Sequence, residues 1–99
     1  MSNAEKYRAI KFEEAHMQLM ETERKFRKSC TQINLLNAQL EDIKARYKKA
    51  KLENFHRFRY NLRLKLACVE GVRNMYYEYA HVQAERVATL RNQIFGELM

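Results

Sequence analysis

Each of the three histidines in this sequence follows a glutamate by three residues, a spacing that can bind metal. Residues three apart on a helix lie on one face. Glu-x-x-His is the ligand unit of carboxylate-bridged di-iron bundles, in which two such units and two further glutamates face one core. The pattern therefore raises a di-iron bundle as a remote alternative. The three pairs are Glu13 with His16, Glu53 with His56, and Glu78 with His81.

The positions of these histidines argue against a shared metal ion. In the apolar repeat described below, His16 falls beside the packing face, whereas His56 and His81 fall on faces turned away from it. Side chains that point outward cannot meet around a buried ion, so we expect exposed Glu–His pairs that each add little to stability. We therefore expect no metal site, no cofactor and no catalytic residue.

Other catalytic patterns are also missing from the sequence. There is no Gly-rich phosphate loop and no Cys-x-x-Cys, and no serine or threonine has a base at a suggestive spacing. The two cysteines, Cys30 and Cys68, have neither metal-ligand spacing nor the pattern of a small secreted domain. We read both as reduced thiols, which predicts an intracellular, cytoplasmic setting. Because no catalytic pattern is present, we expect a non-enzymatic protein.

Positive charge is concentrated between Lys44 and Lys65. This window holds nine Lys and Arg and one Glu, a net charge of +8, so the other residues together sum to −1 in a chain of net charge +7. Aromatic side chains alternate with the cations, which suits stacking on bases, insertion at an anionic lipid surface, or docking on an acidic protein. The alternative is that the cations only keep a solvated face. We call the following residues the basic bend: Lys48, Lys49, Lys51, Phe55, Arg57, Phe58, Arg59 and Arg63.

The composition is typical of long helices. The chain has 99 residues, no Pro, no Trp, and glycine only at positions 71 and 96, while 31% of its residues are charged. We expect one helical domain over residues 1–99, all-α and elongated. No stretch approaches 18 apolar residues, so we expect no transmembrane segment, and the N-terminus does not resemble a signal peptide.

Two heptad repeats run along the chain, one in each half. The second begins one residue later than the first would require, so the repeat slips between residues 48 and 55. Both repeats stay in phase elsewhere, including through Ser29 and Gly71, where a helix could otherwise stop. We call the apolar residues of the two repeats the packing seam: Phe12, Leu19, Phe26, Ile33, Leu36, Leu40, Tyr47, Leu62, Leu66, Val69, Tyr76, Val87, Leu90 and Ile94.

The slip has two structural explanations. One is a helical hairpin of two long antiparallel helices with coiled-coil packing, in which Asn54 takes the left-handed conformation at a helix end. The other is one continuous coiled-coil helix with a local change of supercoil. The near-equal halves favour the hairpin, whereas the absence of Gly and Pro from the turn favours continuity. We predict the hairpin, with helices over residues 3–50 and 55–95 and a basic junction over 48–56.

The hairpin makes detailed predictions about caps and layers. Ser2 and Glu5 fit an N-terminal capping box, and Gly96 suits a C-terminal cap. Folding about residue 52 or 53 sets apolar residues opposite one another across the seam. The predicted pairs include Leu40 with Leu66, Ile33 with Val72, and Tyr47 with Phe58.

The second half carries more apolar residues than one seam needs. A second stripe at helical spacing indicates a helix with two apolar faces, which either pairs hairpins into a four-helix bundle or docks another protein. We call it the second stripe: Leu64, Cys68, Val72, Met75, Tyr79 and Val82.

These features predict a structural or adaptor subunit of a larger assembly. The seams would supply assembly, as a homo- or hetero-oligomer, and the basic bend would dock other protein chains of acidic character. The alternative is a module that binds nucleic acid or an anionic membrane through the same cations.

Overall fold

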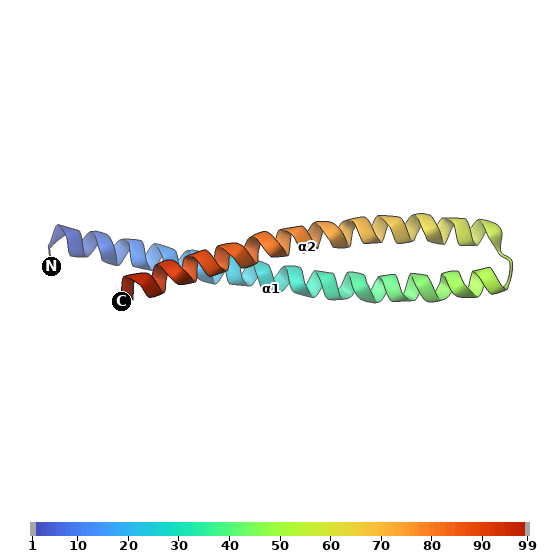
Figure 1. Ribbon diagram of the computed structural model, residues 1–99, viewed down its shortest axis with the longest axis horizontal. Helices are drawn as coiled ribbons and strands as arrows, with labels where there is room; N and C mark the ends of the chain where they lie inside the picture. Colours follow the sequence, from blue (N-terminus) through green and yellow to red (C-terminus); the bar gives the residue numbers. More distant parts are fainter. Residues whose placement is uncertain (1, 99) are drawn as a thin grey trace. The chain divides into compact units, whose positions relative to one another are not determined.

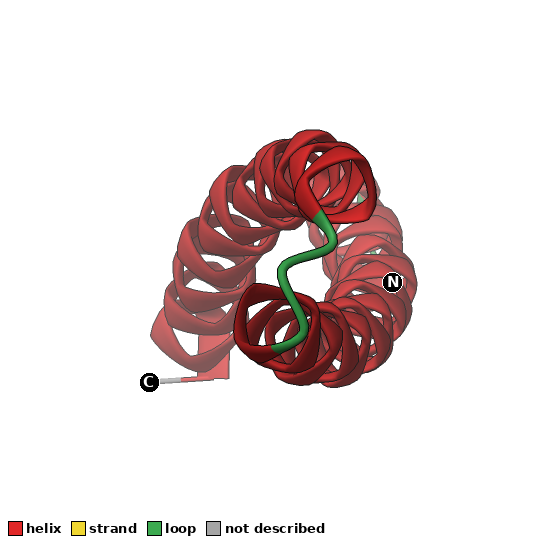
Figure 2. Cartoon of the chain, turned by 90° about the vertical axis from the view of Figure 1, so that its right-hand side faces the viewer, coloured by secondary structure: helices red, strands yellow, loops and turns green. Residues whose placement is uncertain are grey.

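The computed structural model describes residues 2–98, and the side chains of residues 2–96. They form two helices, α1 over Asn3–Leu52 and α2 over His56–Leu98 (Figure 1). A short loop at residues 53–55 joins them (Figure 2). The two helices run antiparallel, so the predicted all-α helical hairpin is confirmed and the continuous helix is wrong.

The start of α1 has the predicted capping box. The Glu5 backbone N–H donates to the Ser2 hydroxyl at 3.2 Å, and the Ser2 backbone N–H donates to the Glu5 carboxylate at 3.4 Å. Each side chain thereby satisfies a backbone donor that the helix leaves without a partner. The helix consequently begins at Asn3.

The turn is built around Asn54, which has a φ of 58°. The Phe55 N–H donates to the Ala50 carbonyl at 3.0 Å, and the Asn54 N–H donates to the Lys51 carbonyl at 3.4 Å. This pair of bonds is a Schellman motif, which stops a helix by placing one left-handed residue just beyond its end. Asparagine tolerates that conformation better than other non-glycine residues, so the predicted role of Asn54 is confirmed.

Neither glycine ends a helix. Both have negative φ and lie inside α2, which continues past Gly96 to Leu98. The predicted C-terminal cap at Gly96 is therefore wrong. A glycine forms such a cap only by adopting positive φ, and nothing requires this residue to do so. Gly71 continues the helix, as the unbroken heptad phase predicts.

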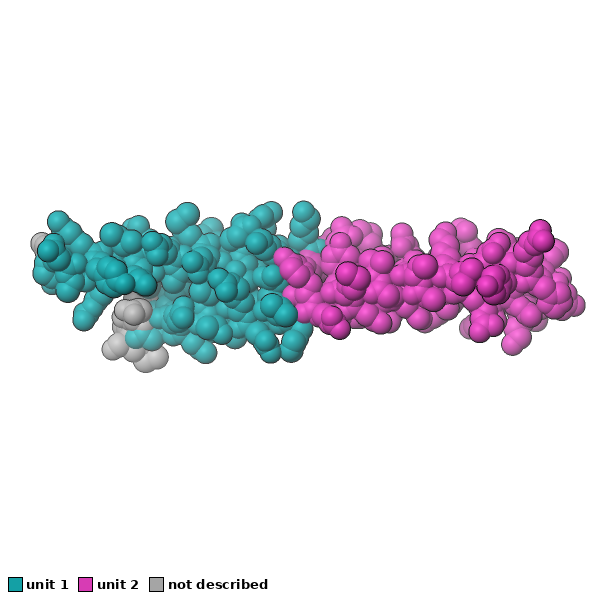
Figure 3. Space-filling view, turned by 90° about the horizontal axis from the view of Figure 1, so that it is seen from above, with its two compact units in different colours: residues 1–28, 80–99 teal, residues 29–79 magenta. Residues whose placement is uncertain are grey.

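The chain divides into two compact units, coloured separately in Figure 3. One comprises residues 29–79, which contain the turn. Its core is formed by Ile43, Ala50 and Leu62, with three half-buried neighbours packed against them. Leu40 has the most completely buried large side chain, at 1% exposure. The neighbours are Tyr47, Leu66 and Val69.

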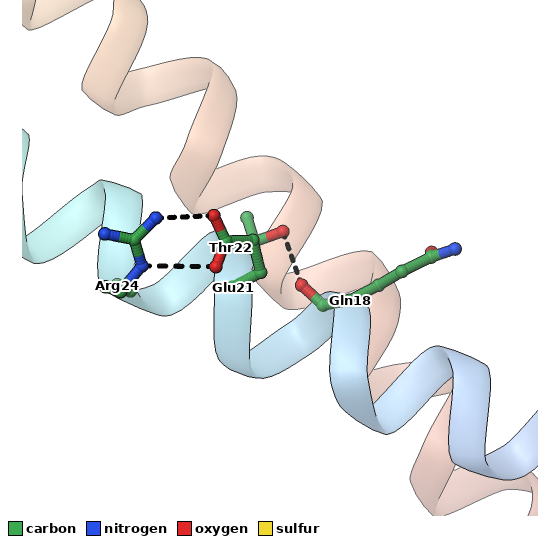
Figure 4. A network of polar contacts seen from close by, with 4 residues as sticks. All are labelled: Gln18, Glu21, Thr22 and Arg24. Carbon is green, nitrogen blue, oxygen red and sulfur yellow. Dashed lines mark hydrogen bonds and ion pairs between the residues drawn. The ribbon is translucent and has the colours of Figure 1, made fainter.

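The other unit comprises residues 1–28 and 80–99. Leu90 and Ile94 of α2 are buried in it, and so is Thr22 of α1, whose hydroxyl donates to the Gln18 carbonyl at 2.7 Å (Figure 4). An ion pair joins the helices, with Arg91 Nη2 at 2.8 Å from the Glu23 carboxylate. This unit thus mixes apolar layers with polar contacts between its helices.

Two of the predicted layers differ from the structure. Val72 and Phe58, expected opposite Ile33 and Tyr47, are both exposed, at 43% and 50%. The loop occupies residues 53–55, so the chain folds later than residue 52 or 53, which changes the α2 residue that meets each α1 residue. Every residue that we assigned to the packing seam is nevertheless buried or half-buried.

Candidate functional site

The basic bend lies at the turn, where α1 ends and α2 begins. Lys48, Lys49 and Lys51 stand on the last turns of α1, and the three arginines stand on the first turns of α2. All of these cations are exposed except Arg59, which is half-buried. The hairpin therefore brings together at one end two groups of cations from either side of the loop.

Exposed apolar side chains lie among these cations. Phe55 and Phe58 are 55% and 50% exposed, so neither belongs to the core. Phe55 is the first apolar residue of the second heptad repeat, and it lies outside the packing seam. Leu52 is 85% exposed, and Tyr60 is exposed as well. We did not predict Leu52 as part of the basic bend. It is the last residue of α1, next to the turn, and it belongs to neither heptad repeat.

Both phenylalanines line two shallow surface depressions. One lies on the α2 side of the turn and is lined by residues from Asn54 to Asn61. The other, of about 470 Å³, lies between the helices and includes Arg46 and Lys49 of α1. The aromatic rings therefore form an apolar centre that is bordered by cations.

The arginines of the basic bend lie at the unfavourable end of a helix. The N-terminus of a helix carries partial positive charge, so cations there are destabilising, whereas Lys49 and Lys51 at the C-terminus of α1 are favoured. The first turn of α2 contains no acidic residue to offset Arg57 and Arg59. An anionic group bound here would interact favourably with the helix end and with both arginines.

The structure does not neutralise this charge internally. Among the described residues, none of the six cations of the basic bend forms an ion pair. Arg46, one turn earlier, is paired with Asp42 at 3.1 Å. The Arg59 guanidinium lies 3.3 Å from the His56 ring nitrogen. Glu53 is the single acidic residue of the turn, and it is exposed.

The Glu-x-x-His pairs do not converge. His81 contacts Glu85, at 3.1 Å, rather than Glu78, and the His16 ring stacks on Phe12. All three histidines are exposed. Within residues 2–98, no group of three or more His, Cys, Asp or Glu side chains is placed to hold a metal ion.

A polar cluster interrupts the core of residues 29–79, and the sequence did not reveal it. Arg73 Nη1 donates to Asn37 Oδ1 at 3.4 Å, and the Asn37 amide donates to the Tyr77 hydroxyl at the same distance. The Arg73 guanidinium also lies 5.6 Å from the centre of the Tyr77 ring. Arg73 follows Val69 of the packing seam by four residues and therefore lies on the same side of the helix. This spacing was the available signal, because a cation there requires partners across the seam.

Comparisons with known proteins supply no function. No protein-family model, no curated protein and no solved structure matches this chain. None of the described helices has a stretch that is both long and apolar enough to cross a membrane. The two cysteines are free thiols, Cys30 half-buried and Cys68 exposed.

Proposed function

We propose that this chain is a non-enzymatic structural or adaptor subunit of a larger assembly, and that its basic bend docks an acidic protein. One observation carries the proposal. Among the described residues Arg57 and Arg59 have no acidic partner, and they stand at the positive end of α2 beside two exposed phenylalanines. That arrangement lowers the stability of the isolated hairpin, and an acidic partner would offset the cost.

The form of the surface favours a protein partner. Protein interfaces combine an apolar, often aromatic centre with a polar rim, and a few aromatic or arginine residues supply most of the binding energy. Phe55 and Phe58 would be the apolar anchors, and the cations would set orientation and speed association. The free thiols Cys30 and Cys68 support an intracellular, cytoplasmic setting.

A second candidate uses the same residues. Exposed phenylalanines among cations would also stack on single-stranded bases or enter the surface of an anionic membrane. Leu52, the most exposed large apolar side chain of the turn, favours the membrane within this class.

The test compares two variants that each lose five positive charges. In the first, Lys48, Lys49, Lys51, Arg57 and Arg59 become Gln. In the control, Lys6, Arg8, Lys11, Lys28 and Arg86, all exposed and outside the basic bend, become Gln. Glutamine is nearly as good a helix former, so both variants should keep their helicity.

Size-exclusion chromatography of extracts from the protein's own cells is the first measurement. The wild type and the control should elute in a complex much larger than the 12.0 kDa chain and dissociate as salt rises. The basic-bend variant should elute at the size of the free protein. A basic-bend variant that still enters the complex would overturn the proposal.

The purified chain is then mixed with phosphatidylserine vesicles and, separately, with a single-stranded oligonucleotide. Weak binding to both, with the complex lost only in the basic-bend variant, supports a protein partner. Strong binding to either probe that the basic-bend variant loses would replace the protein partner with the second candidate.

A further inference from the structure

The surface depression between the two helices at the turn combines apolar and charged lining residues. Its volume of about 470 Å³ falls within the size range of ligand pockets, although it is shallow. Residues from the end of α1 and from the loop and first turn of α2 meet in it. We call it the turn depression, and it is lined by Arg46, Lys49, Ala50, Glu53, Phe55 and Phe58.

The apolar part of the turn depression offers aromatic surface that the hairpin leaves uncovered. Ala50 is buried, at 1% exposure, so it lies at the floor, whereas Phe55 and Phe58 are both at least half exposed. An aromatic side chain of a partner would cover both rings at once. Aromatic pairs are stabilised beyond the area that they bury, so an aromatic residue fits this surface better than a polar one.

The charges of the turn depression determine where an acidic residue can lie. Arg46, Lys49 and Glu53 are spaced three and four residues apart, so they share one face of α1. The two cations stand on the side away from the turn, and the acid stands next to the turn. A carboxylate of the partner would therefore be attracted at one end of the depression and repelled at the other.

Lys49 is the cation of this face that is available to a partner. Arg46 is already paired with Asp42, whereas Lys49 has no acidic partner among the described residues. An α-helix turns by about 100° per residue, so Lys48 and Lys51 project from other faces of α1, and neither lines the turn depression. Lys49 should therefore contribute to binding through its position as well as its charge.

We propose that the turn depression binds one aromatic side chain from an acidic segment of the partner, with the carboxylates of that segment on the side of Lys49 and none beside Glu53. This inference rests on the docking function proposed above, and it adds the sequence class that the site recognises. That class is an aromatic residue with acidic residues on one side only. Charge complementarity to Lys49 and Glu53 selects it, and the exposed rings require its apolar centre.

Dye-labelled peptides test the sequence class with the full chain. The one-sided peptide is Glu-Glu-Glu-Glu-Phe-Gln-Gln-Gln-Gln, and the split peptide is Gln-Gln-Glu-Glu-Phe-Glu-Glu-Gln-Gln. The one-sided peptide should bind severalfold tighter, because the split peptide places a carboxylate beside Glu53. Replacing its Phe with Ser should weaken binding about tenfold. Fluorescence anisotropy at low salt measures all three, and a one-sided peptide that fails to bind, or binds no better than either of the others, overturns the proposal.

Variants of the chain locate the contact. Lys49→Gln should weaken the one-sided peptide severalfold, whereas Lys44→Gln, the same loss of charge at an exposed position of α1 outside the depression, should change it less than about twofold. Glu53→Gln should remove the difference between the one-sided and the split peptide. Circular dichroism should show unchanged helicity, since all three positions are exposed. Equal losses in Lys44→Gln and Lys49→Gln would show attraction to the net charge alone and refute the site.

Failure of this proposal can be told apart from failure of the docking function. If the chain joins its complex through the basic bend while the one-sided peptide behaves like its Ser version, only the recognition of an aromatic residue is wrong. If the variant with five Gln in the basic bend also joins the complex, the docking function fails and the turn depression loses its role with it.

Discussion

Single residues decide where this chain turns. The helix stop at Asn54 depends on one left-handed residue and two backbone hydrogen bonds, with no glycine or proline nearby. The sequence could predict this role, because asparagine is the residue of the turn that best tolerates positive φ. It could not predict the first residue of α2, which we expected at 55 and which the structure has at His56, because the start of that helix depends on how both helices pack.

Substitutions at Asn54 should therefore change stability. Asn54→Ala should lower the free energy of unfolding by about 1 kcal/mol, because a Cβ without a compensating amide is strained at this φ. Asn54→Gly should preserve or slightly raise it. Chemical denaturation measures both, with Asn61→Ala inside α2 as a control that should not destabilise. An unchanged Asn54→Ala protein would show that the turn does not depend on this conformation.

The carboxyl of Glu21 has a lowered pKa, mainly because the Arg24 side chain donates hydrogen bonds to it at 2.7 and 3.1 Å (Figure 4). The positive charges of Arg24 and Lys25 add to this effect. The pair stabilises the fold at pH values above the unfolded carboxyl's pKa, and that stabilisation is lost as pH falls through the lower folded value. NMR titration should show the pKa of Glu21 rising in Arg24→Gln and unchanged in Arg8→Gln.

The two helices were predictable because their signals are local and repeated. A heptad phase kept along each helix fixes which residues face the partner helix, and each seam residue is buried or half-buried accordingly. The pairing of layers was not predictable, because sliding one apolar seam along another still leaves apolar residues opposite each other. Phe58 shows the result, since a shift of the turn places it outside the core.

The centre of the seam should not tolerate charge. Leu40→Asp should lower the free energy of unfolding by at least about 3 kcal/mol, since it removes a fully buried side chain and buries an unpaired carboxylate. Leu35→Asp, the same change on the exposed side of α1, should cost less than about 1 kcal/mol. Circular dichroism during thermal unfolding compares them, and equal losses would mean that the seam is wrongly assigned.

For the molecule as a whole, the apolar and charged parts of the basic bend should contribute differently to docking. Replacing Phe55 and Phe58 with Ala should weaken the complex about tenfold or more without changing its salt dependence, because aromatic anchors act through burial rather than charge. Helicity should be unchanged, since neither ring is in the core. Met17 and Met20 changed to Ala are the matched control. An unaffected complex would indicate a purely electrostatic contact.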